Sequence, residues 1–212
     1  MTIQEKAIEI YKRLLADNPN PKVELTHSNP FELLAATILS AQSTDKMVNT
    51  LTPLLFKTFP TIADYANATP EEIDTYVTRV LFHNNKSKSI HGSAKMILEK
   101  HGGIVPNTMK ELDALPGVAR KTANVVLGSA FGIAEGIVID THGIRLSNKL
   151  GLTKSKDPVK IEQDLMKLLP KSCWIQFGQL LTLHGRYVCK AKAHTCDPCP
   201  LGDLCPEFTS KK

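Results

Sequence analysis

The chain has 212 residues, of which 42% are hydrophobic, and it carries a formal net charge of +5. This length and composition exclude a disordered or fibrous protein and allow one large hydrophobic core or two small ones. The N-terminal stretch MTIQEKAIEIYKRLL contains no apolar run long enough for a signal peptide or a membrane span. We therefore expect a cytoplasmic protein, and its basic balance gives slight support to an anionic partner.

Helical patterns follow one another along the whole chain, and no alternating strand pattern interrupts them. In the first half, apolar periodicity, cap residues and helix-ending glycines predict helices over residues 3–15, 31–41, 45–56, 70–80 and 86–101. In the second half they predict helices over residues 109–114, 120–131, 141–150, 158–169 and 173–188. Pro53 should kink or split the third of these helices. The sequence therefore predicts an all-α protein.

Four of the five cysteines lie close together near the C-terminus, at Cys189, Cys196, Cys199 and Cys205. Disulfides are rare in the cytosol, so four clustered thiols indicate a metal site. One short C-x2-C pair is flanked by longer arms, whereas zinc sites usually combine two short pairs. On chemistry alone, a four-cysteine zinc site and an iron-sulfur cluster both remain open.

The predicted helices over residues 109–114 and 120–131 are joined by LPGV, a connection short enough to form a helix-hairpin-helix. Gly117 permits a left-handed turn, and N–H groups beside a helix N-terminus form an anion-binding concavity. Arg120 and Lys121 begin the second helix, where each cation is unfavourable by about 0.3–1 kcal/mol near the surface. A DNA phosphate would supply the missing negative charge, although a simple corner between two helices also fits the hairpin alone.

Four motifs together resemble the endonuclease III branch of the helix-hairpin-helix DNA glycosylases. They are LSAQSTDK at 39–46, LPGVARKTANVVL at 115–127, VIDTHGIRLSNKLGL at 138–152 and LHGRYVCKAKAHTCDPCPLGDLC at 183–205. The motifs occur in the family's order and the resemblance extends along nearly the whole chain, which makes it specific.

The resemblance implies a two-lobed, all-α helix-hairpin-helix DNA glycosylase fold with an iron-sulfur cluster loop. A six-helix lobe over residues 22–134 would contain the hairpin, and a second lobe would combine residues 1–21 with 135–212. The resemblance also implies that the four C-terminal cysteines bind a 4Fe-4S cluster. We expect double-stranded DNA as the partner, no membrane association and a monomeric protein.

Lys121 matches the nucleophile of this family. A free amine can attack the anomeric sugar carbon, expel a damaged base and form a Schiff base. An ordinary lysine pKa of about 10.4 leaves little free amine at neutral pH. Desolvation in a cleft and the positive end of a helix both favour the free form, so the placement of Lys121 would help to activate it. We expect Arg120 to be an ordinary solvated cation.

Asp140, in VIDTH, matches the catalytic carboxylate of the family. It could deprotonate the lysine or stabilise positive charge that develops on the sugar. An aspartate just before a helical segment is also a favoured N-cap, and the two roles are compatible. We leave the nearby His142 out of the catalytic set.

A glycosylase takes its target base out of the stack, and the resulting void has to be filled. Gln42 matches the void-filling residue of the family. The segment VLFHNNKSKSI resembles the second intercalating loop, with Phe82 in place of the usual leucine and Leu81 in place of glycine. An aromatic ring can still act as a wedge. The plain alternatives are a polar residue near a helix end for Gln42 and a core residue for Phe82.

Ala119 stands where the hairpin usually has a second glycine. In a left-handed conformation this alanine would cost on the order of 1 kcal/mol, but it would cost little if the site needs only close approach to a phosphate. The arm between Cys189 and Cys196 offers Lys190, Lys192 and His194 for contacts with the DNA backbone, which position a protein without reading sequence.

The sequence as a whole predicts a bifunctional DNA glycosylase and abasic-site lyase in base excision repair. It would remove oxidised pyrimidines from duplex DNA through a lysine Schiff base and β-elimination, in the cytoplasm at the nucleoid. An adenine-glycosylase-type relative would share the cluster and the aspartate, but Lys121 and the absence of a long C-terminal domain argue against it. A non-catalytic, metal-stabilised DNA-binding module is the third possibility, although both catalytic residues are retained.

Overall fold

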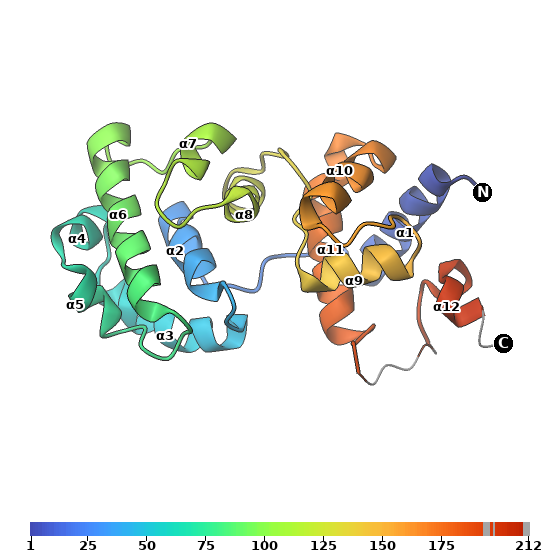
Figure 1. Ribbon diagram of the computed structural model, residues 1–212, viewed down its shortest axis with the longest axis horizontal. Helices are drawn as coiled ribbons and strands as arrows, with labels where there is room; N and C mark the ends of the chain where they lie inside the picture. Colours follow the sequence, from blue (N-terminus) through green and yellow to red (C-terminus); the bar gives the residue numbers. More distant parts are fainter. Residues whose placement is uncertain (193–195, 197, 210–212) are drawn as a thin grey trace. The chain divides into compact units, whose positions relative to one another are not determined.

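The computed structural model describes residues 1–192, 196 and 198–209. The chain divides into two compact units, one of residues 24–133 and the other of residues 1–23 with 134–212, and the described secondary structure is helical without a β-strand (Figure 1). The expected all-α, two-lobed class is confirmed. Every helix in the described residues is too short or too polar to span a bilayer.

The unit of residues 24–133 is built around one apolar helix, α2. The helices of this unit are α2 (Pro30–Ser40), α3 (Asp45–Thr58), α4 (Ile62–Asn67), α5 (Pro70–Asp74), α6 (His83–His101), α7 (Met109–Asp113) and α8 (Arg120–Phe131). Seven of the eleven residues of α2 are buried, because α3, α6 and α8 all pack against it. A helix that is apolar on most of its faces is stable only in such a central position.

The second unit joins the N-terminal helix to the C-terminal third of the chain. Its elements are α1 (Ile3–Asp17), α9 (Thr141–Lys149), α10 (Pro158–Leu168), a 3₁₀ turn (Lys171–Cys173), α11 (Trp174–Tyr187), a second 3₁₀ turn (Gly202–Leu204) and α12 (Pro206–Thr209). Ile10 and Leu14 of α1 share one apolar cluster with Phe177 and Leu181 of α11. The first helix of the sequence therefore completes the core of the C-terminal segment.

The expected split of a helix at Pro53 is wrong, because α3 runs continuously from Asp45 to Thr58. Val48, Thr52 and Leu55 are buried and hold this helix against the core, while Pro53 itself is exposed. The carbonyl that loses its intrahelical hydrogen bond to the proline therefore lies on the solvent side, where water can satisfy it.

The region between α4 and α6 also differs from the prediction. The short helix α4 went unpredicted, although Thr61 and Asp64 form a capping box that marks its start. The helix expected over residues 70–80 ends at Asp74, and the chain then turns so that Val77 and Val80 are buried. Burial of these two valines thus overrides the helical pattern of the sequence.

Candidate functional site

The helix-hairpin-helix forms as the sequence predicts, with α7, a tight turn and α8. Gly117 has φ 74°, and a Cβ added there would lie 2.5 Å from the Cβ of Ser89. Ser93 donates a hydrogen bond to the carbonyl of Pro116, 2.8 Å away. Glycine at 117 is therefore required by both conformation and space, and α6 is the platform on which the turn rests.

Ala119 is the N-cap residue of α8 and has extended backbone, with φ −108° and ψ 168°. The left-handed conformation that would penalise alanine is absent, so the departure from glycine costs no backbone strain here. Ala119 is exposed and offers no side-chain cap to the helix. The first N–H groups of α8 are thus available to an external anion.

Lys121 is the second residue of α8, and its side chain is exposed. The unit that carries Lys121 therefore leaves this side chain in water, and the expected desolvation stays a prediction for the complex with DNA. The helix end itself is as expected: the first turn of α8 holds no acidic residue, and Arg120 is also exposed. Bound DNA would have to supply the missing desolvation.

Asp140 is the N-cap of α9, and its Oδ1 accepts a 2.8 Å hydrogen bond from the backbone N–H of Gly143. This bond uses one of the two carboxylate oxygens. The segment before Asp140 is fixed by close packing: a Cβ added at Gly178 of α11 would lie 3.0 Å from the backbone of Val138. A second contact of this kind places His142 against Gly185 of the same helix. The carboxylate is therefore held on a rigid support.

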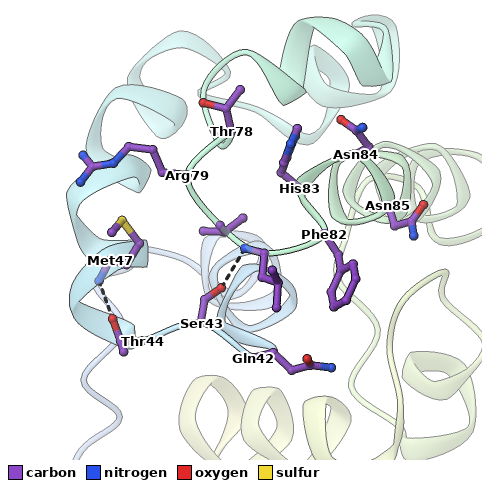
Figure 2. Close-up of a pocket in the computed structure, with 12 residues that line it drawn as sticks. Gln42, Ser43, Thr44, Met47, Thr78, Arg79, Phe82, His83, Asn84 and Asn85 are labelled. Carbon is purple, nitrogen blue, oxygen red and sulfur yellow. Dashed lines mark hydrogen bonds between the residues drawn. The ribbon is translucent and has the colours of Figure 1, made fainter.

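Gln42 and Phe82 share an unusual backbone conformation. Among the described residues, only these two have positive φ without being glycine, at 55° and 57°. A non-glycine residue in this conformation costs about 1–2 kcal/mol, and such strain tends to mark functional positions. Phe82 is 56% exposed, so the alternative of a core phenylalanine is wrong. Figure 2 shows both residues on loops that line one surface pocket, together with Met47 and Arg79.

The four C-terminal cysteines line a single cavity between α9, α11 and the C-terminal segment. The described residues contain no group of three or more His, Cys, Asp or Glu side chains placed to hold one metal ion. Burial raises the pKa of the Cys199 thiol, which disfavours its thiolate unless a bound cation compensates.

Three polar side chains that the motifs do not point to approach the cysteine sulfurs. Arg145 Nη1 lies 3.8 Å from Cys189 Sγ, Lys149 Nζ lies 3.9 Å from the same sulfur, and His184 Nε2 lies 3.9 Å from Cys199 Sγ. Burial lowers the pKa of His184. Arg145 and Lys149 are four residues apart and so share one face of α9, which was a signal available in the sequence.

The arm after α11 is described only in part. Lys190 and Lys192 are both exposed, whereas His194 lies outside the described residues. The two lysines are therefore accessible to a phosphate backbone.

Comparison with known proteins agrees with this arrangement. The HhH-GPD family, whose members are described as HhH-GPD superfamily base excision DNA repair proteins, matches residues 35–171. Those residues include the hairpin, Lys121 and Asp140. The fold and the matched segment thus define a helix-hairpin-helix base excision repair protein.

More specific similarity is found over almost the full length of the chain. Endonuclease III of Synechocystis sp. is 47% identical over 203 residues, which cover 96% of this chain and 93% of the relative. Two solved structures, a non-covalent endonuclease III–DNA complex and a trapped endonuclease III–DNA covalent intermediate with an estranged adenine, each have 38% identity and a TM-score of 0.92. Each match covers 100% of this chain and 99% of the other. The chain belongs to the endonuclease III family of the HhH-GPD superfamily, as its motifs predicted.

Proposed function

We propose that this chain is a bifunctional DNA glycosylase and abasic-site lyase that removes oxidised pyrimidines from duplex DNA in base excision repair. The observation that carries the proposal is an exposed lysine at the uncapped start of α8, directly after the hairpin turn at Gly117. The similarity to a trapped endonuclease III–DNA covalent intermediate supports a covalent mechanism. The protein acts as a monomer, in the cytoplasm at the nucleoid.

Lys121 is the nucleophile in this proposal. Its free amine attacks the anomeric carbon of the damaged nucleotide, the glycosidic bond breaks, and the base leaves with the electron pair of that bond and takes up a proton. Opening of the sugar then gives a protonated Schiff base. Loss of a proton from the adjacent sugar carbon expels the 3′ phosphate by β-elimination, and water releases the lysine. Asp140 accepts a proton from the lysine or stabilises the positive sugar.

The remaining residues contact DNA in two ways. Some bind backbone phosphates and so provide affinity, and others support extrusion of the damaged base. The hairpin at Gly117 and Ala119 binds a backbone phosphate through N–H groups in the first turn of α8, and Lys190 and Lys192 contact further phosphates. Gln42 and Phe82 fill the space left by the extruded nucleotide. The positive φ of both residues and the exposure of the Phe82 ring support this assignment.

Cys189, Cys196, Cys199 and Cys205 would hold a 4Fe-4S cluster. All four thiols line one cavity, and four cysteine thiolates are the donor set that holds an iron-sulfur cluster. A bound cluster would cross-link the residues that follow α11 to the C-terminal segment, since Cys189 lies just after α11 and the other three cysteines lie in that segment. Arg145 and Lys149, which lie close to Cys189 Sγ, offset the negative charge of the sulfurs.

Borohydride trapping on a duplex with one abasic site tests the proposal. An imine is reduced to a stable amine, so the wild-type chain should form a covalent protein–DNA complex, and strand cleavage should occur without borohydride. Lys121→Gln should abolish trapping and cleavage but retain binding, while Arg120→Gln, the matched neighbour, should still be trapped. Trapping that survives in Lys121→Gln would sink the mechanism. Binding without cleavage by the wild type would instead identify a non-catalytic module.

A further inference from the structure

A buried lysine holds the loop at the end of α2. Among the described lysines only Lys86, in the first turn of α6, is buried, with 7% of the residue exposed. Its ammonium group donates hydrogen bonds to the carbonyl oxygens of Leu39 at 2.8 Å and Ala41 at 2.6 Å, and lies 3.4 Å from Ser43 Oγ. These partners stand on both sides of Gln42, at a helix C-terminus where unpaired carbonyls carry negative partial charge.

The second loop is tied to the same point. The backbone N–H of Leu81 donates to Ser43 Oγ at 3.3 Å, a bond drawn in Figure 2. Phe82 follows and is the N-cap of α6, in left-handed conformation and without a side-chain cap. His83, the next residue, pairs with Asp74 at 2.7 Å. The backbone on both sides of Phe82 is therefore anchored, and one anchor is the serine that also contacts the buried ammonium.

Burial of a charged ammonium group at this position is energetically unfavourable. Its burial disfavours the charged form and lowers the pKa of Lys86. The sulfur of a methionine of similar length would fill the space without that cost but could donate no hydrogen bond. What the lysine provides is several donors from one atom, aimed at two carbonyls that precede a strained residue and at the hydroxyl that follows it. Strained backbone persists only when its surroundings determine it in this way.

We infer that Lys86 is a positioning residue that couples the two loops, so that Gln42 and Phe82 are presented to DNA as one wedge. Lys86 does not touch DNA itself, because its ammonium faces the carbonyls of α2. This inference rests on the proposed function, which brings both side chains into the duplex. It predicts that a change that frees either loop impairs insertion of both Gln42 and Phe82 into the duplex. Binding to the backbone phosphates should stay the same.

The test uses the full-length holoprotein and two duplexes, one undamaged and one with a stable abasic-site analogue opposite 2-aminopurine. Lys86→Met should lower affinity for the abasic duplex by about tenfold or more, the effect of losing a charged hydrogen bond. The 2-aminopurine signal of insertion should fall as well. Affinity for the undamaged duplex and its salt dependence should not change. Lys100→Met, which removes an exposed lysine from the last turn of the same helix, is the matched control and should match the wild type.

A double-mutant cycle separates positioning from general stability. In a background that carries both Gln42→Ala and Phe82→Ala, the contacts that Lys86 positions are already gone, so Lys86→Met should add little further loss. An additive loss, or an equal loss on the undamaged duplex, would overturn the inference. If Lys86→Met fails to fold, Ser43→Ala replaces it in the cycle with the same expected pattern. Borohydride trapping of the wild type in the same samples tests the proposed function separately.

Discussion

The helices α8 and α9 begin in opposite ways. The N-terminus of α9 is capped by Asp140, whose carboxylate accepts a hydrogen bond from a backbone N–H in the first turn of the helix. α8 starts at an alanine without a side-chain cap and has Arg120 and Lys121 as its first residues. Because a helix N-terminus carries about half a positive charge, α9 neutralises this charge within the chain. α8 leaves its own charge for an external anion.

The structure describes all of residues 24–133, and the helices of this unit show the same contrast between starts with and without a side-chain cap. Most of these helices have a side-chain cap, from Asn29 for α2, Thr44 for α3, Thr61 for α4, Thr69 for α5 and Thr108 for α7. The exceptions are α6 and α8, whose N-caps are Phe82 and Ala119. Both exceptions are residues proposed to contact DNA. In this unit, each helix start without a side-chain cap thus coincides with a proposed DNA contact.

The largest effect on activity is expected from substitution of Asp140, the N-cap of α9. Asparagine is an N-cap as good as aspartate, so Asp140→Asn should keep α9 intact but lower the rate of strand cleavage by about 10²–10⁴-fold, the usual range for a positioned acid or base. Asp140→Ala should lose activity and also about 1 kcal/mol of unfolding free energy. Cleavage kinetics and thermal unfolding distinguish these results. An Asp140→Asn protein that turns over normally would leave Asp140 with its cap role alone.

The second prediction concerns the unit that contains α9 and asks whether its folding depends on a bound iron-sulfur cluster. Protein purified without oxygen should contain roughly four irons per chain and absorb broadly at about 400 nm, as iron-thiolate centres do. Cys199→Ser should lose this absorption, and soluble yield and DNA binding should fall together. Cys173→Ser, at the cysteine outside the cavity, is the control and should retain its iron. Stoichiometric zinc without iron would contradict the cluster assignment.

The third prediction gives α8 the side-chain N-cap that α9 already has. Ala119 already has the extended backbone of an N-cap, so Ala119→Ser should satisfy an N–H of the first turn and raise the unfolding free energy by about 1 kcal/mol. The serine hydroxyl then competes with the phosphate, and affinity for the abasic duplex should fall. Ala119→Gly should leave this affinity equal or improved. Tighter binding by the serine variant would show that α8 does not hold a phosphate.

The smallest effect is expected at the arm after α11. If Lys192 contacts one phosphate, Lys192→Ala should reduce the slope of log affinity against log salt concentration by about 1. Binding titrations at several salt concentrations measure this slope. An unchanged slope would remove Lys192 from the interface and leave the hairpin as the main phosphate contact.

The sequence by itself determined those features that depend on neighbours along the chain. The start of α8 at Arg120, the N-cap at Asp140 and the turn at Gly117 follow from local propensity and spacing, and all three are observed. The clustering of the cysteines likewise predicted that they belong together, and they line one cavity.

Only the tertiary structure decided the features that depend on distant contacts. The exposure of Phe82 is set by a loop that anchors to α2 and α5, and lysines are so commonly exposed that nothing in the sequence distinguishes Lys86. The exposure of Lys121 and the extended backbone at Ala119 were equally undetermined, because the motif is compatible with either outcome. Burial and backbone strain arise from packing between segments that are remote in sequence, and a local pattern carries no information about them.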